Sequence, residues 1–192
     1  MHPCLGRSAR AAFVTIGALF AFAAACEAPA PLETAASGSA SGGGEPDPWA
    51  APDVCEGGSY WSGQGTKDMS PGTPCIGCHG PGQGTEFVLA GTVFTTGHVP
   101  DACKATPAQQ GDLGQAHVFV KDAAGVVLTL PVWPSGNFMQ KPPAAPLVLP
   151  ITAWVAAGGR ERHMLGAQMS GDCNACHTDG GDAGTRGRIV LP

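Results

Sequence analysis

The sequence predicts a small, mainly β protein, most simply a β-sandwich, on three observations. Short apolar stretches rich in Val, Ile, Leu and Phe recur between residues 86 and 192, and turn-forming residues separate them. No long window in this part of the chain has the 3.6-residue periodicity of a helix. Gly (29) and Pro (18) are abundant among the 192 residues, which is typical of a chain with many turns. About seven short strands with frequent turns suit a small sandwich.

The expected strands follow one another along the chain. Residues 87–94 form the first, and residues 116–120 and 126–130 form a hairpin, because Asp-Ala-Ala-Gly at 122–125 has turn chemistry. A turn and a short strand are expected at 135–139, and later strands at 147–149, 151–155, 160–165 and 188–192.

The N-terminus has the pattern of a secretory signal of the lipoprotein type, assigned to residues 1–25. Arg7 and Arg10 precede an apolar run that ends in Ala-Ala-Ala-Cys. In a lipoprotein the final Cys, here Cys26, becomes the mature N-terminus and carries lipid. The box has Ala23 where Leu is usual, so ordinary signal cleavage with an incidental Cys26 stays an alternative.

Residues 26–53 read as a flexible linker, because they are rich in Pro, Gly and Ser. The folded domain is then expected over residues 54–192. Such a chain would be exported and anchored by lipid to a bacterial membrane, facing the periplasm or the cell exterior. The formal net charge of −5 argues against nucleic acid as a partner.

Two copies of the pattern Cys-x-x-Cys-His stand at the two ends of the expected domain. They occupy residues 75–79 and 173–177. This is the attachment signature of c-type haem, in which each thiol adds to one vinyl group and the adjacent His ligates the iron. The sequence therefore predicts two covalent haem groups, one held by Cys75 and Cys78 and the other by Cys173 and Cys176.

The neighbouring His79 and His177 are the expected proximal ligands of these two haems. The sixth ligands are less determined by sequence, and we expect His98 for one haem and Met164, or else His163, for the other. The remaining candidates are His117, Met69, Met139 and Met169. Because the termini of a sandwich often lie close together, we also expect the two haems to exchange electrons.

The eight cysteines are all used in this interpretation. Cys4 leaves with the signal, Cys26 takes lipid and four cysteines hold haem, so Cys55 and Cys103 remain to form a disulfide outside the cytoplasm. Three alternatives use the four motif thiols differently: a zinc site with all four thiols as ligands, a thioredoxin-like redox pair, and plain structural disulfides. The long gap between the two pairs argues against zinc, and the Gly and Pro residues around the first pair argue against a thioredoxin-like turn.

The stretches at 91–94, 118–125 and 136–138 resemble the prealbumin-like sandwich of carboxypeptidase regulatory-like modules. With a haem motif at each end, residues 70–192 resemble small bacterial dihaem c-type cytochrome lipoproteins. The resemblance implies haem binding and electron transfer. The chain departs from the all-α fold of soluble mono-haem cytochromes, so only short helical turns are expected at the motifs.

The function expected from these features is that of an exported dihaem electron carrier with redox proteins as partners and a membrane reached through its lipid anchor. Two other functions remain open. A haem enzyme of the peroxidase or nitrogen-oxide type would need acid–base groups at an open distal site. A haem-bearing binding or sensor module would use the sandwich to contact its target.

Overall fold

The computed structural model describes residues 46–52, 54–59, 65–142 and 146–192. The predicted signal peptide, Cys26 and most of the predicted linker lie outside these residues. The elements in chain order are α1 (Ile76–His79), β1 (Leu89–Phe94), α2 (Pro107–Leu113), β2 (His117–Lys121), β3 (Val127–Pro131), β4 (Asn137–Gln140), β5 (Thr152–Ala157), β6 (Arg160–His163), η1 (Cys173–Ala175) and β7 (Ile189–Val190).

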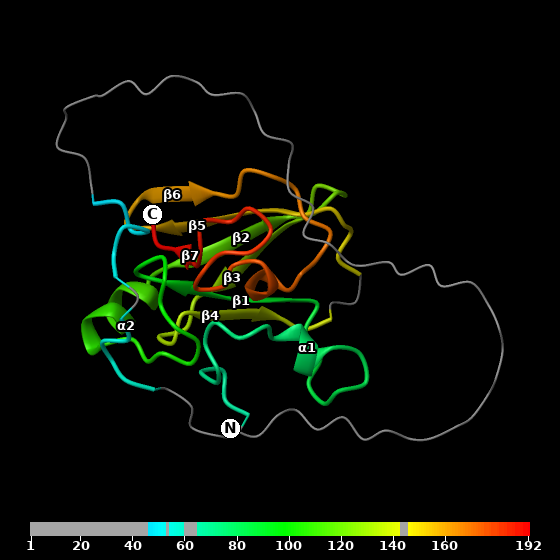
Figure 1. Cartoon of the computed structure of the whole chain (residues 1–192). Helices are drawn as coiled ribbons and strands as arrows, with labels where there is room; N and C mark the ends of the chain where they lie inside the picture. Colours follow the sequence, from blue (N-terminus) through cyan, green and yellow to red (C-terminus); the bar gives the residue numbers. More distant parts are fainter. Residues whose placement is uncertain (1–45, 53, 60–64, 143–145) are drawn as a thin grey trace, which may run out of the picture.

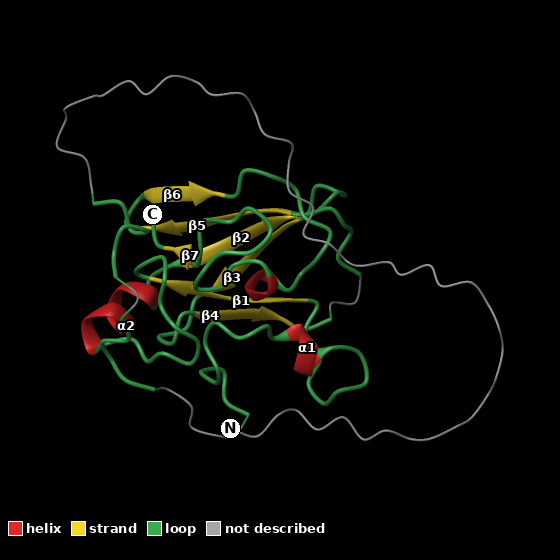
Figure 2. Cartoon of the chain, in the orientation of Figure 1, coloured by secondary structure: helices red, strands yellow, loops and turns green. Residues whose placement is uncertain are grey.

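The strands form two sheets, which agrees with the predicted mainly β class and with a sandwich (Figures 1 and 2). The first sheet has the order β4-β1-β7, and its β1 runs antiparallel to β4 and parallel to β7. The second sheet has the order β3-β2-β5-β6 and is antiparallel throughout. The predicted hairpin is therefore β2–β3, with Val118 opposite Leu130.

The core lies where the two sheets face each other. Leu89, Val93 and Phe138 from the first sheet pack in one cluster with Val118 and Val155 from the second. In β2 burial alternates, as expected for a strand with one face on a core. Every residue of β1 is buried, so this strand is covered on both faces. One face of β1 lies on the core, and residues next to the second motif pair with Ala90 of this strand.

Two elements differ from the sequence prediction. Residues 147–149 do not form a strand, because Asp122 holds this segment as a loop: its Oδ2 accepts from Val148 N–H (3.4 Å), and Val148 C=O accepts from Ala123 N–H (2.9 Å). Helix α2 was not predicted. It begins at a capping box, in which Thr106 Oγ1 accepts from Gln109 N–H and Gln109 Oε1 accepts from Thr106 N–H.

The structure contains the predicted disulfide between Cys55 and Cys103, with an S–S distance of 2.07 Å. Cys103 also packs with Phe94 and Val99 in a small second cluster of buried residues. The disulfide thus fastens the segment that follows the linker to the end of β1.

Residues 46–52, the last part of the predicted linker, contact the domain. Asp47 forms a 2.6 Å ion pair with Arg186, and Pro48 C=O accepts from Gly97 N–H (2.9 Å). The ring of Trp49 lies beneath the guanidinium groups of Arg186 (4.4 Å) and Arg162 (4.9 Å). We call residues 46–52 the N-terminal strap.

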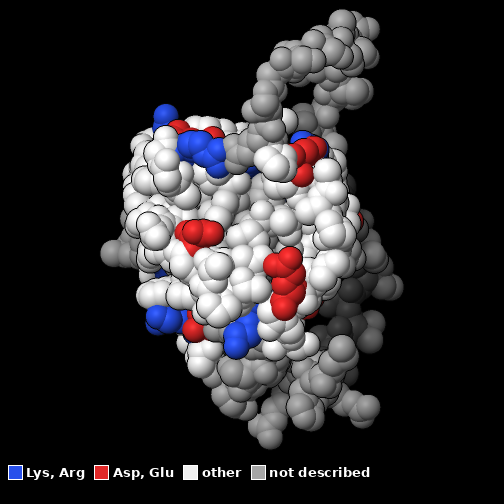
Figure 3. All heavy atoms as spheres, turned by 90° about the vertical axis from the view of Figure 1, so that its left-hand side faces the viewer, with Lys and Arg blue, Asp and Glu red and all other residues white. Residues whose placement is uncertain are grey.

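The side of the molecule that carries α2 is seen in Figure 3. Among its described residues, acidic and basic side chains are interspersed, and neither sign forms a continuous patch. Within the same described ranges, none of the helices has the length and apolarity needed to cross a membrane.

Candidate functional site

Each Cys-x-x-Cys-His motif forms one tight turn. In the first motif, Cys75 C=O accepts from the N–H groups of Cys78 (3.1 Å) and His79 (2.9 Å). The second motif repeats this pattern at Cys173, whose C=O accepts from its second Cys (3.3 Å) and its His (3.0 Å). Since residues three and four apart in such a turn are neighbours, each motif gathers two sulfurs and one imidazole at one turn.

The two turns are joined through Asp172, the residue before the second motif. Its carboxylate accepts from the N–H groups of Cys75 (3.3 Å) and Ile76 (3.0 Å), at the N-terminus of α1. Burial raises the pKa of the Asp172 carboxyl, and these backbone donors oppose the shift. The residue directly before the second motif therefore caps the helical turn of the first.

A second link is Asn174, which lies inside the second motif and is fully buried. Its Oδ1 accepts from Thr92 N–H (2.9 Å), and its Nδ2 donates to Thr92 Oγ1 (3.0 Å) and to Thr73 C=O (3.0 Å). The same Nδ2 lies 3.9 Å from Cys75 Sγ. The two motifs, at opposite ends of the domain in sequence, are thus in direct contact, and the second is tied to Thr92 on β1.

Arg188 provides a third link. This fully buried side chain donates from Nη1 to the carbonyls of Gly72 (3.0 Å) and His177 (3.2 Å), from Nε to Val99 C=O (2.8 Å), and pairs through Nη2 with Asp101 (2.7 Å). It therefore ties the approach to the first motif to the last residue of the second.

The second motif is seated directly on β1. Gly171 C=O accepts from Ala90 N–H (2.9 Å), and Asp172 forms a parallel bridge with Ala90. A Cβ on Gly91 would stand 2.8 Å from Cys173 Cβ and 2.6 Å from Phe138 Cζ. Only glycine at position 91 lets the motif pack this closely on the strand.

Both motif imidazoles are held in the same way. His79 Nδ1 lies 2.8 Å from Thr85 C=O, and His177 Nδ1 lies 3.0 Å from Gly187 C=O. Because a carbonyl only accepts, Nδ1 carries the proton in each ring, and Nε2 of the neutral ring is left as a lone-pair donor. Burial lowers the pKa of His177, which favours this neutral form. A backbone carbonyl on the far nitrogen is a common support for a metal-ligating His.

The four motif sulfurs are in two states. Cys75 and Cys173 are free thiols, and burial, reinforced by the Asp172 carboxylate, raises the pKa of each to about 12. Cys78 and Cys176 are each disulfide-bonded. Attachment of haem through thioethers would require all four sulfurs as thiols.

Of the expected sixth ligands, His98 lies beside the second motif. It occupies the predicted loop after β1, and its Nδ1 lies 2.5 Å from Asp179 C=O, two residues beyond His177. A Cβ on Gly187 would stand 3.2 Å from His98 Nδ1. Like the motif imidazoles, His98 thus has its Nδ1 on a carbonyl and its Nε2 available.

The other two expected ligands lie at the end of β6 and directly after it. His163 stacks on Trp154 (5.5 Å between ring centroids) and pairs with Glu161 (2.8 Å) on the outer face of the second sheet. Met164 follows β6, and its N–H donates to Ala153 C=O (2.9 Å). Figure 1 shows β6 and α1 on opposite sides of the molecule. The structure does not bring His163 to α1.

The sequence analysis missed Asp172, Asn174 and Arg188, although all three are needed to join the motifs. An Asp directly before a predicted turn can be recognised as a possible cap. No feature of the sequence indicates that it caps a turn 97 positions earlier in the chain. A lone Arg near the C-terminus likewise gives no sequence indication of burial.

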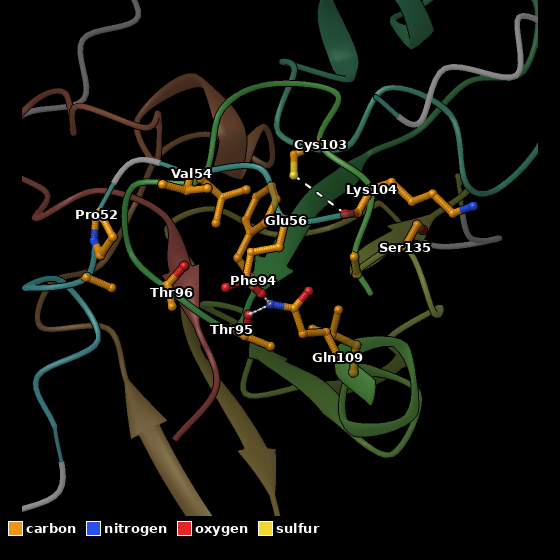
Figure 4. Close-up of a pocket in the computed structure, with 14 residues that line it drawn as sticks. Pro52, Val54, Glu56, Phe94, Thr95, Thr96, Cys103, Lys104, Gln109 and Ser135 are labelled. Atoms are coloured by element: carbon orange, nitrogen blue, oxygen red, sulfur yellow. Dashed lines mark hydrogen bonds between the residues drawn. The ribbon is translucent and has the colours of Figure 1, made fainter. Parts of the chain in front are cut away.

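A cavity of about 70 Å³ lies next to the disulfide rather than at the motifs (Figure 4). Gln109 reaches toward it from α2 and donates to Thr95 Oγ1 (3.0 Å) and Glu56 Oε2 (3.2 Å). Among the described residues, no group of three or more His, Cys, Asp or Glu side chains is arranged to hold a metal ion.

Comparison of this chain with protein-family models, with curated proteins and with solved structures found no match.

Proposed function

We propose that this protein is an exported c-type cytochrome that carries two covalent haems and transfers electrons at a membrane surface. The observation that carries the proposal is the matched state of the two motif imidazoles. His79 and His177 each follow a Cys-x-x-Cys turn, and each has its Nδ1 on a backbone carbonyl, at 2.8 and 3.0 Å. Each ring therefore presents Nε2, the nitrogen that a haem iron would take.

The residues that would hold the two groups follow from the motifs. Cys75 and Cys78 would bind the first through thioethers, with His79 as ligand, and the second motif would do the same with its own two cysteines and His177. Each haem supplies a reversible one-electron iron couple when bound. The contribution of the chain is to hold the sulfurs and imidazoles of both motifs in one place.

The contact between the motifs supports electron exchange within the molecule. Asn174 of the second motif lies 3.9 Å from Cys75 Sγ of the first. Two groups attached to adjoining turns are held near each other by the fold, whatever the position of the domain relative to the membrane. The membrane part of the proposal rests on the sequence of residues 1–53, with its signal-like run, Cys26 and the Pro/Gly/Ser linker.

The experiment is haem stoichiometry in the mature chain, produced with its own signal in a bacterium that attaches c-type haem. We expect two haems per chain by pyridine haemochrome, and two porphyrins retained on the denatured polypeptide by intact mass. Cys75→Ala together with Cys78→Ala should leave one haem. The matched control, Cys55→Ala with Cys103→Ala, removes two cysteines outside the motifs and should retain two. A colourless wild-type protein would overturn the proposal.

The same contact weakens the sequence argument against a second candidate, a zinc site with the four motif cysteines as ligands, although among the described residues no group of three or more His, Cys, Asp or Glu side chains is arranged to hold a metal ion. The sequence argument against zinc was the long gap between the two pairs, but the fold brings Asn174 and Cys75 together across 99 residues. A zinc site would leave the two carbonyl-bound imidazoles without a role, and for this reason we favour haem. Metal analysis of the same preparation separates the two, because zinc at one per chain without haem would select the second candidate.

A further inference from the structure

We propose, resting on the function above, that the second motif positions the first. In this arrangement Asp172 and Asn174 are positioning residues for haem attachment at Cys75 and Cys78, whereas the second site forms without help from the first. Although the two motifs have the same sequence pattern, haem attachment at the first site would therefore depend on the second, and not the reverse.

The first step of the argument is the weakness of α1 on its own. The helix has four residues, its N-cap is Cys75, and no side chain of its own segment caps it. A single helical turn is unstable in isolation, because its ordering cost exceeds what one or two backbone hydrogen bonds return. The Asp172 carboxylate supplies the acceptor for the N–H groups of Cys75 (3.3 Å) and Ile76 (3.0 Å) at the start of this turn. The turn that presents the first pair of thiols thus depends on the residue directly before the second motif.

The second step concerns the approach to the first motif. Thr73 stands two residues before Cys75, and its C=O accepts from Asn174 Nδ2 (3.0 Å). Asn174 is in turn fixed by Thr92 on β1, through Oδ1 (2.9 Å) and Nδ2 (3.0 Å). A side chain of the second motif therefore helps to set the distance of Cys75 from the sheet.

The third step is the asymmetry between the sites. The second motif contacts β1 directly. Ala90 N–H donates to Gly171 C=O (2.9 Å), and Cys173 packs closely against Gly91. The first motif reaches β1 directly through Gly72 N–H to Thr92 Oγ1 (2.9 Å), before the cysteines begin. Loss of Asp172 should therefore affect the first site more than the second.

The test measures haem at each site separately in the full chain. After reduction, trypsin separates the motifs, because Lys67 and Lys104 bound the first and Arg162 and Arg186 bound the second. In Asp172→Ala we expect the haem-bearing fraction of peptide 68–104 to fall about fivefold, the size expected for a lost helix cap, while peptide 163–186 keeps its haem. Asp172→Asn retains one acceptor oxygen and should restore part of the loss.

The control is Asp182→Ala, which removes an exposed carboxylate from the loop after the second motif and should leave both peptides as in wild type. Equal loss from both peptides in Asp172→Ala would mean a general folding defect and would overturn the positioning role. Unchanged loading of the first peptide would overturn it as well. Either result leaves the proposed function standing if the wild-type chain carries two haems. Wild-type peptides that both lack haem would instead refute the proposed function.

Discussion

Arg188 and Asp101 form an ion pair of 2.7 Å in which the arginine side chain is 1% exposed and the aspartate 59%. The guanidinium is therefore buried, whereas the carboxylate that it pairs with is largely exposed to solvent. Its other donors are taken by backbone carbonyls, two of which belong to the segments that carry the motifs. The pair thus belongs to the framework that holds the two turns together.

Replacing Arg188 should destabilise the protein. Arg188→Leu leaves the carbonyls of Gly72, Val99 and His177 buried without this donor, and we expect the free energy of unfolding to fall by about 3 kcal/mol. Asp101→Asn should cost only about 1 kcal/mol, because the aspartate is mostly exposed. Urea unfolding of both variants measures the difference. Equal losses in the two would contradict the role given to the buried carbonyl contacts.

A methyl group at position 91 should be poorly tolerated. Its Cβ would stand 2.6 Å from Phe138 Cζ and 2.8 Å from Cys173 Cβ, so Gly91→Ala should lower the unfolding free energy by about 1–3 kcal/mol through overpacking. The matched control is Gly111→Ala inside α2, where no neighbour lies within 4 Å of the added carbon. That change should raise stability by about 0.5–1 kcal/mol, because alanine favours a helix. Thermal melts that rank the two variants in the reverse order would refute the packing argument.

The N-terminal strap should depend on pH through Asp47. The hydrogen bond from Arg186 lowers the pKa of Asp47 from its ordinary value of 3.8. A lowered carboxyl pKa stabilises the folded state above the unfolded value, and this contribution is lost as the pH falls through the folded value. Wild type should therefore exceed Asp47→Asn in stability at neutral pH, and the two should converge at acid pH, once the pH has fallen through the lowered pKa of Asp47.

The pH effect at Asp47 is measured from melting temperatures over a pH series. The pair with Arg186 is exposed, so added salt should shrink the difference between wild type and the variant. A difference that persists at the lowest pH would assign the effect to packing rather than to charge.

The two candidate histidines for the sixth ligands, His98 and His163, lie in different parts of the fold, so mutation can distinguish them. Under the proposed function, His98→Ala should change the spectrum of one haem from low spin to high spin, because His98 lies beside the second motif with Nε2 available. His163→Ala should leave both haems unchanged, since His163 stacks on Trp154 at the outer face of the second sheet. Electron paramagnetic resonance of the oxidised proteins reads both outcomes. A change in the His163 variant alone would reverse the assignment.

If the chain carries two haems as proposed, the contact between the motifs predicts magnetic interaction between them. Asn174 and Cys75 lie 3.9 Å apart across the junction, so groups attached to the adjoining turns are held close. The oxidised wild-type protein should give a spectrum that differs from the sum of two single-site variants, each with one Cys pair changed to Ala. Exact additivity would contradict close placement of the haems while leaving their attachment unaffected.

Much of the fold could be predicted from local sequence, and the misses have physical causes. Alternating apolar residues and turn chemistry located β2 and β3, and the capping box before α2 could have been read from Thr106, Pro107 and Gln109. Residues 147–149 have the composition of a strand but form a loop, because two hydrogen bonds link Val148 to the turn at Asp122 and Ala123. Such tertiary contacts override an apolar run of three residues.

The sequence by itself determined the two Cys-x-x-Cys-His patterns, the mainly β class and the pairing of Cys55 with Cys103. These depend on residue type, on short spacing and on the number of cysteines left over after the motifs, which can all be read from the sequence. Only the tertiary structure decided that the two motifs touch, that Asp172 caps the turn of the other motif, and that His98 and His163 lie in different parts of the fold. Contacts between residues about a hundred positions apart depend on how β1 is covered, and no local pattern in the chain encodes that geometry.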